Sequence, residues 1–219
     1  MRWPDWNRTP LWSEREGGAG PSRPPPLTAG PERREKIVSQ ELSQKTTTSQ
    51  KQFRAAMRRL PTSVVVVSAV LDDAPIGMVV GTFSSVSMDP LLVGFFGDHR
   101  SSTLEPLLKT DQWSFNLLAQ DHNTVADNFR KPRAERFTDI AWSMSDHGTP
   151  VIDGAVLTIH GRQHSVQPAG DHSLVLAEVT HIETSPAPCR PLVYFESRLT
   201  RLDPGHLVPG DSWQLGWND

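Results

Sequence analysis

The pattern of apolar and polar positions predicts many strands and few helices. Phe53, Met57 and Leu60 recur at helical spacing after Thr48 and Ser49, either of which can cap a helix. The unbroken apolar run from residue 64 to residue 67 is typical of a strand buried on both faces. Further strands are predicted over 79–88, 91–96, 113–119, 155–167, 173–184 and 191–196, short helices over 101–109 and 121–129, and a loop over 130–150. This succession suits a closed or nearly closed barrel, because closure removes exposed strand edges.

Composition divides the chain into three parts. Residues 1–31 hold seven of the 19 prolines, whereas all eight phenylalanines lie between Phe53 and Phe195. A segment rich in Pro and Gly cannot bury enough apolar surface to offset its ordering entropy. We therefore predict a disordered N-terminal extension over 1–48, one domain over 49–203 and a C-terminal tail over 204–219.

Charge and cysteine usage exclude several classes of protein. A net charge of -3 argues against a nucleic-acid-binding protein, for which a basic face is expected. The sequence contains neither the apolar run that a membrane span requires nor a secretory signal at its N-terminus. Cys189 is the single cysteine, which excludes an internal disulfide framework. We expect a cytoplasmic protein that binds neither nucleic acid nor membranes.

The segment from Gly77 to Pro90 holds the first candidate binding residues. If it is one strand, Thr82 and Ser84 lie on one face and Ser85 on the other, and neither face is cleanly apolar. Small hydroxyl residues near two glycines would let a flat ligand approach the backbone closely. Hydroxyl groups and backbone N–H groups could then bond a heteroaromatic edge, a ribityl chain or a phosphate.

A second candidate follows at Arg100-Ser101-Ser102-Thr103, where a predicted helix opens directly after a strand. Unpaired N–H groups and the positive end of the helix dipole favour an anion there, and Arg100 adds a full charge. Ordinary capping by Ser101 or Ser102 explains the same residues without a ligand. The two interpretations are compatible, because a cap and a phosphate use neighbouring donors.

These two stretches, followed by Phe115-Asn116-Leu117-Leu118 and Gly170-Asp171-His172, resemble the flavin reductase-like family in order and spacing. The resemblance runs from about Phe53 to Tyr194. It implies a mainly β fold, an FMN-binding split β-barrel with short peripheral helices, that forms a homodimer. It also implies an NAD(P)H-dependent flavin reductase that supplies reduced FMN or FAD to a partner flavin-dependent monooxygenase, by hydride transfer from NADH or NADPH to flavin N5.

The resemblance assigns roles to particular residues. It implies that His172 lies near the nicotinamide side of the ring, where it would orient the nicotinamide or relay a proton. It implies contacts with the flavin for a larger set, in which Asn128 and Phe129 would act across the dimer: Pro75, Ile76, Gly77, Met78, Val79, Gly81, Thr82, Ser84, Ser85, Phe96, Gly97, Asp98, Arg100, Ser101, Ser102, Asn128 and Phe129.

Two departures from the family pattern leave other functions open. Thr62-Ser63 stands where the family has Thr-Gly, and residues 194–199 replace an Arg-Gly pair followed by a Tyr. One alternative is a split-barrel flavoprotein that retains its flavin and acts on a separate organic substrate. The other is a non-catalytic flavin-binding or scaffold protein.

A metal site is not expected from the spacing of the eight histidines. His160 and His164 share a strand face but lie about 13 Å apart, too far to chelate one ion. His122 and His147 show no ligand spacing of a known kind. The basic run 131–136 is predicted to be a solvated loop, and the 2'-phosphate of NADPH is the alternative partner for it.

Overall fold

The computed structural model describes residues 48–185 and 190–202. Cys189, the predicted C-terminal tail and all but Thr48 of the predicted N-terminal extension lie outside the described residues. Every element described here belongs to one unit, Gln50–Asp219.

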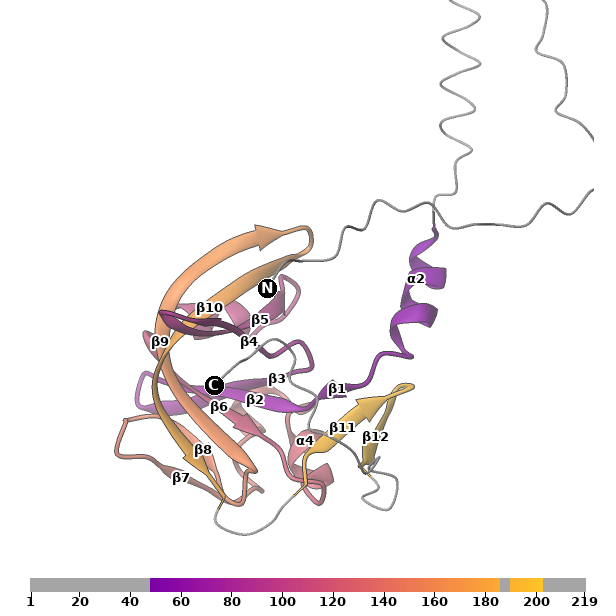
Figure 1. Cartoon of the computed structure of the whole chain (residues 1–219). Helices are drawn as coiled ribbons and strands as arrows, with labels where there is room; N and C mark the ends of the chain where they lie inside the picture. The colour runs from indigo at the N-terminus through magenta and orange to yellow at the C-terminus, as the bar shows by residue number, and fades with distance from the viewer. Residues whose placement is uncertain (1–47, 186–189, 203–219) are drawn as a thin grey trace, which may run out of the picture. The chain divides into compact units, whose positions relative to one another are not determined.

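Seven antiparallel strands form the main sheet, in the order β3-β2-β6-β9-β10-β5-β4 (Figure 1). The longest two, β9 and β10, make the curved hairpin that dominates the view in Figure 1. The strands are β2 (Val65–Leu71), β3 (Ala74–Val80), β4 (Ser84–Met88), β5 (Leu91–Asp98), β6 (Gln112–Leu117), β9 (Leu157–Ala169) and β10 (His172–Thr184). The predicted mainly β fold is therefore confirmed.

Strand β2 separates the two apolar cores of the unit, as its sequence predicts. Val65 and Val67 belong to the core enclosed by the main sheet, together with Phe95 and Phe115. Val64 and Val66 belong to a second core on the opposite face, under the helix α4 (Asn123–Asn128). Side chains alternate between the two faces of a strand, so a continuous valine run can serve both cores.

The predicted strand over 79–88 is wrong, because the chain turns within it. Strand β3 ends at Val80 and β4 begins at Ser84. These two strands form the opposite ends of the seven-strand order, so residues 81–83 carry the chain from one edge of the sheet to the other. Thr82 and Ser84 consequently do not share one strand face.

The helices are short, and their starts differ from the prediction. Helix α2 (Gln50–Met57) follows Thr48 and Ser49 as expected, but it buries none of its residues. Helix α3 (Leu104–Leu108) begins three residues later than predicted, and α4 begins at Asn123, two residues later than predicted, with His122 at its N-cap. Intrinsic capping preference is a weak signal that tertiary packing overrides.

Two small sheets complete the unit. Strand β11 (Leu192–Phe195) pairs with both β1 (Thr62–Ser63) and β12 (Arg198–Arg201). The predicted loop over 130–150 contains a 3-10 helix, η1 (Arg133–Glu135), and a strand, β7 (Trp142–Met144), which pairs with β8 (Pro150–Ile152). None of the described helices is long and apolar enough to cross a membrane.

Candidate functional site

The candidate site lies where the two edges of the main sheet approach each other without pairing. Thr82, in the connection between the edge strands β3 and β4, bonds to β5: its Oγ1 accepts a hydrogen bond from Phe96 N–H at 2.9 Å and donates one to Phe96 O at 3.2 Å. A side chain thus takes the place of a backbone ladder partner between the end of β3 and the end of β5. We call the region between β3 and the 96–103 segment, where side-chain hydrogen bonds stand in place of strand pairing, the split.

Arg136 bridges the same two segments farther along the split. Its Nη1 donates to Gly77 O on β3 and to Thr103 Oγ1, both at 2.8 Å. The guanidinium is half-buried, and this burial lowers the pKa of Arg136 from its ordinary value, with Arg133 nearby acting in the same direction. Arginine remains charged even so, so Arg136 places a fixed positive charge in the split.

Sequence reasoning missed Arg136, which it placed in a solvated loop. The residue lies 59 positions from Gly77 and 33 from Thr103, and only the fold brings the three together. No local sequence signal distinguishes it from the neighbouring exposed Arg133.

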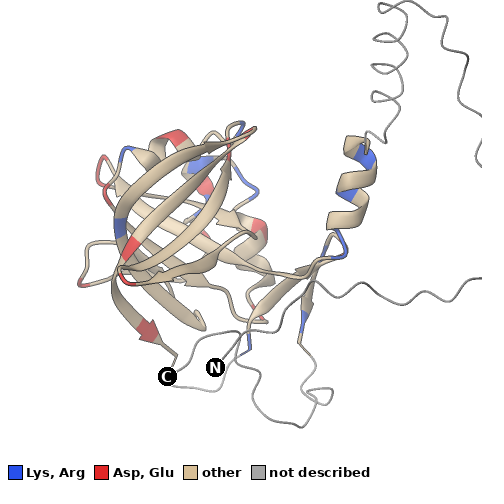
Figure 2. Ribbon diagram, turned by 45° about the horizontal axis from the view of Figure 1, so that its top comes forward, with Lys and Arg blue, Asp and Glu red and all other residues tan. Residues whose placement is uncertain are grey.

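Charged groups gather at the end of β5. Arg100 makes hydrogen bonds to both oxygens of Asp98, the shorter at 2.6 Å, and they hold the pKa of the Asp98 carboxyl well below its usual range. Asp98 is also the register partner of His172 at the start of β10. Elsewhere on the unit, basic and acidic residues are interspersed (Figure 2).

The predicted anion site therefore rests on side chains rather than on a helix dipole. Helix α3 has only five residues and its N-cap, Thr103, makes no side-chain capping bond. Ser101 Oγ accepts from Thr103 N–H at 3.3 Å, whereas the exposed Ser102 side chain has no hydrogen-bond partner within the described residues. Within the described residues, Ser102 Oγ and Arg100 Nη1 have no hydrogen-bond partner, whereas Arg100 Nε and Nη2 are bonded to Asp98.

His172 is held by its neighbour in the sequence. Its Nδ1 lies 2.7 Å from Asp171 Oδ1, and this contact lowers the pKa of Asp171. On the adjacent residue Ser173, Oγ contacts His99 Nε2 at 3.0 Å. The half-buried imidazole thus sits beside Asp98, at the same end of the split as the predicted phosphate contacts.

At three glycines near the split, protein atoms already occupy the space that a Cβ would need. A Cβ at Gly77 would lie 3.0 Å from the Phe129 ring, at Gly81 2.9 Å from Thr62 Oγ1, and at Gly97 2.4 Å from Leu104 Cδ1. Packing therefore explains these glycines without a ligand. We expected Gly77 and Gly81 to allow close approach of a flat ligand. In the structure, close packing of other protein atoms accounts for the glycine at both positions.

The other predicted contact residues divide into buried and exposed groups. Ile76 and Met78 face the enclosed core, while Pro75 and Val79 are partly exposed. Asn128 is buried and donates to Arg136 O at 3.3 Å, and Phe129 is buried against Phe137. The exposed members are Thr82, Ser84, Ser85, Phe96, Arg100 and Ser102.

The atypical 194–199 segment lies next to the split. It forms the tight turn between β11 and β12, with Glu196 and Ser197 at positive φ. Tyr194 is the register partner of Thr62, and Thr62 is the residue that covers Gly81. The segment therefore borders the connection between β3 and β4.

Comparisons with known proteins agree on one family. The profile of the flavin reductase like domain matches residues 57–203. A flavin reductase of Pseudomonas putida is 35% identical over 60% of this chain and 78% of its own, and an NADH:FMN oxidoreductase of Rhodococcus erythropolis is 33% identical over 69% and 81%.

Solved structures give the same result. Nitrilotriacetate monooxygenase component B from Mycobacterium thermoresistibile matches with a TM-score of 0.71 and 27% identity, covering 76% of this chain and 93% of that one. Flavin reductase HpaC, solved with NADP+, matches with a TM-score of 0.66 and 27% identity, covering 70% and 98%. This chain belongs to the flavin reductase-like family.

Proposed function

We propose that this chain is an NAD(P)H-dependent flavin reductase that binds its flavin along the split and releases it reduced to a flavin-dependent monooxygenase. The observation that carries the proposal is the split itself. Thr82 and Arg136 hold β3 and its connection to β4 against the 96–103 segment, and exposed hydroxyl groups, an exposed aromatic ring and a cationic side chain lie next to these bonds.

These residues suit a flavin mononucleotide chemically. The Phe96 ring, 44% exposed, offers an apolar face to a flat heteroaromatic ring. Ser84 and Ser85 lie on β4, an edge strand, where alternate backbone N–H groups have no ladder partner. Arg100 and Ser102 offer a charge and a hydroxyl to a phosphate. A bound flavin supplies the hydride acceptor at N5.

The protein's own contribution is to position the flavin and nicotinamide rings and to stabilise the charge that develops during hydride transfer. Hydride transfer requires no nucleophilic side chain, so the site needs only to stack two rings and to favour developing negative charge. The guanidinium of Arg136 and the N–H groups beside Ser84 and Ser85 would supply that electrostatic stabilisation. His172, held through Nδ1 by Asp171, would present its Nε2 to the nicotinamide.

The monooxygenase partner is proposed from the relatives. The reductase subunit HsaB of a flavin-dependent monooxygenase in Mycobacterium tuberculosis is 28% identical over 72% of this chain. The reductase component of a trigonelline monooxygenase from Acinetobacter baylyi is 29% identical over 62% of it. Supply of a separate monooxygenase by this chain would require that it release its reduced flavin.

A homodimer is part of the proposal. Large apolar side chains on the β4–β5 hairpin remain exposed in the single chain: Val86 is 49% exposed, Met88 64% and Leu91 46%. A group of exposed apolar side chains next to the unpaired side of an edge strand marks an interaction surface. Sedimentation equilibrium should give twice the chain mass, and Met88→Lys should shift the equilibrium toward the monomer.

The domain boundary is proposed at Ser49. The family profile begins at residue 57 and ends at residue 203, which supports a flavin-binding domain over 49–203. Deleting residues 1–48 should leave the flavin dissociation constant nearly unchanged. A large loss of affinity would place part of the extension in the flavin site.

Steady-state oxidation of NADH and NADPH, with and without added FMN or FAD, tests the function. Oxidation should depend on added flavin and saturate with it, and the preferred pair identifies the two substrates. If the protein instead retains flavin on purification, and its rate of NADH or NADPH oxidation does not depend on added flavin, it would be a flavoprotein that acts on another substrate. Flavin binding without oxidation would leave only a binding role.

A further inference from the structure

Three histidines and a glutamate meet on the β9–β10 ladder, away from the split. His160 on β9 and His181 on β10 are register partners, so both side chains project from the same face of the sheet. Glu183 follows two positions after His181 on that face. His147, from the turn between β7 and β8, packs against both rings in tilted arrangements, with centroid separations of 4.4 Å to His160 and 4.5 Å to His181.

Three of these residues can converge on one ion. One ring nitrogen of His147, one of His181 and one carboxylate oxygen of Glu183 all lie within 4.8 Å of one another. All three side chains are exposed, so an ion could reach them from solvent. This spacing is compatible with ligand-to-metal distances of about 2.0–2.2 Å for nitrogen and oxygen, after small side-chain rotations.

His160 is arranged as a support for this group rather than as a member of it. Its side chain is buried, and its Nε2 lies 2.9 Å from Glu183 Oε1. Its Nδ1 lies 3.0 Å from the hydroxyl of buried Thr149. A neutral ring that donates through Nε2 and accepts through Nδ1 satisfies both contacts, and it leaves Glu183 Oε2 free. Outer hydrogen bonds of this kind orient metal ligands.

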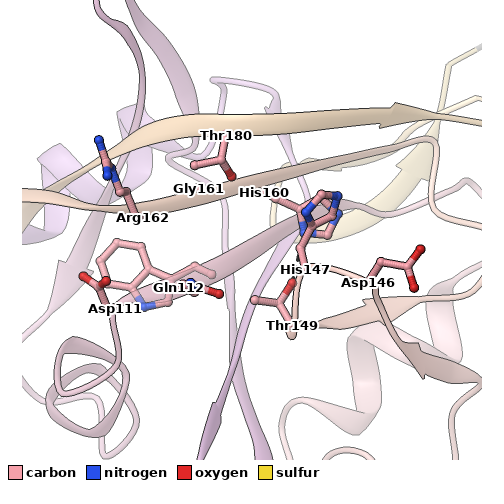
Figure 3. Close-up of a pocket in the computed structure, with 10 residues that line it drawn as sticks. Asp111, Gln112, Asp146, His147, Thr149, His160, Gly161, Arg162 and Thr180 are labelled. Carbon is pink, nitrogen blue, oxygen red and sulfur yellow. Dashed lines mark hydrogen bonds between the residues drawn. The ribbon is translucent and has the colours of Figure 1, made fainter.

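The cluster also borders an open space. His147, Thr149 and His160 line a cavity of about 460 Å³ together with Asp111, Gln112, Trp113, Asp146, Gly161, Arg162 and Thr180 (Figure 3). In Figure 3 the rings of His147 and His160 lie together at one side of this cavity, between the turn that carries Asp146 and the β9 strand. Of the residues that can converge on one ion, only His147 lines this cavity, so the cavity meets the cluster at His147 and at its neighbour His160.

We propose that His147, His181 and Glu183 form a binding site for a divalent transition-metal ion, of which Zn²⁺ is the probe of choice. Two imidazoles and one carboxylate are ligands typical of zinc and of neighbouring first-row metals, whereas calcium and magnesium prefer sites made of oxygen. Three protein ligands leave a coordination position open.

The site is separate from the proposed flavin site. His172 and His181 lie on the same strand, nine residues apart, which corresponds to about 30 Å of extended chain. The ion would join the β7–β8 turn to the part of β10 near His181 and Glu183, far along the strand from His172. The proposal therefore does not depend on whether the chain reduces flavin.

The absence of a metal site was the expectation from the sequence. That expectation considered His147 and His160 but neither His181 nor Glu183, which complete the cluster. His164 is exposed on β9 and does not belong to the group. The ligand from the turn is 34 residues before His181 in the sequence, a separation that no short motif covers. The His181-x-Glu183 pair on one strand face was the available signal.

Calorimetric titration with zinc chloride tests the site, with full-length, tag-free protein stripped by EDTA. One equivalent should bind to the wild type. His147→Ala, His181→Ala and Glu183→Gln should each weaken binding by about 100-fold or more, and His160→Gln, which removes only support, by about 10- to 100-fold. His164 lies on β9, as His160 does, but outside the group, so the His164→Ala variant should bind zinc as the wild type does.

Cobalt substitution gives a second readout. Co²⁺ should produce visible absorption bands that zinc removes and that are absent from His147→Ala and His181→Ala. The thermal unfolding midpoint of each variant in EDTA should match the wild type, because the three ligand side chains are exposed. Failure of the wild type to bind zinc, or equal binding by the wild type and the three ligand variants, would overturn the proposal.

Discussion

The Thr82 hydroxyl forms two hydrogen bonds with the backbone of Phe96, one accepted from N–H at 2.9 Å and one donated to C=O at 3.2 Å. β3 and β4 stand at opposite ends of the sheet order, and this pair of bonds ties the connection between them to β5, the strand next to β4. The proposed flavin site depends on this replacement of strand pairing by side-chain bonds.

Thr82→Val tests that tie. The substitution keeps the side-chain shape and removes both bonds, so the free energy of unfolding should fall by about 1–2 kcal/mol and flavin affinity should fall with it. Urea unfolding and flavin fluorescence titration measure the two effects. Thr82→Ser keeps the hydroxyl and should retain most of both; equal loss in the two variants would mean that the hydroxyl bonds are unimportant.

Arg100→Gln tests the proposed phosphate contact. FMN affinity should fall about tenfold, because a charged hydrogen bond to the phosphate is lost. The affinity for riboflavin, which has no phosphate, should not change. Arg162→Gln is the matched control, since Arg162 is exposed and paired with Glu178 at 2.9 Å on another part of the sheet. An equal loss for FMN and riboflavin would contradict a phosphate role.

Arg136→Met tests the second bridge across the split. It leaves Gly77 O and Thr103 Oγ1 without their donor, and it should lower the free energy of unfolding by about 2 kcal/mol. Arg133→Met, at an exposed position in the same loop, should change stability by no more than about 0.5 kcal/mol. Denaturant unfolding of both variants measures the two changes. A comparable loss of unfolding free energy in both would contradict the bridging role of Arg136.

Acid should weaken the fold through two histidines. Burial lowers the pKa of His122 and of His160 below the ordinary value of 6.5, so the unfolded chain takes up protons first as the pH falls. Their contribution to stability is present above pH 6.5 and is lost as the pH falls through the lowered values.

Unfolding in EDTA at about pH 7.5 and about pH 5.5 measures this loss. His122 Nδ1 accepts from Ala119 N–H at 3.3 Å, so His122→Gln can keep an acceptor there without a titrating group. The variant should lose less stability than the wild type between the two pH values. A wild-type protein more stable at the lower pH would contradict the assignment.

Local patterns in the sequence predict the strands of the fold but not its closure. The valine run identifies β2 as buried on both faces because each valine must face one of two apolar cores. The break at residues 81–83 cannot be predicted in this way. It exists because the chain must cross between sheet edges, and its Gly81 is explained by Thr62, a residue distant in the sequence.

The residues of the candidate site also fall into those that the sequence identifies and those that it does not. Arg100, Ser102 and Phe96 are recognisable from family resemblance and are exposed where a ligand could meet them. Arg136 is not recognisable, because its partners Gly77 and Thr103 reach it only through the fold. Phe129 was expected at the flavin, and in the single chain its ring packs on Gly77 and Phe137.

Anaerobic mixing of the protein and FMN with NADH or NADPH, followed by the loss of oxidised-flavin absorbance, tests the central claim most directly. The wild type should reduce the flavin, and the double variant Thr82→Val with Arg100→Gln should require about 100-fold more FMN to reach the same rate. No reduction by the wild type, or the same FMN dependence in the wild type and the double variant, would contradict hydride transfer to a flavin bound in the split.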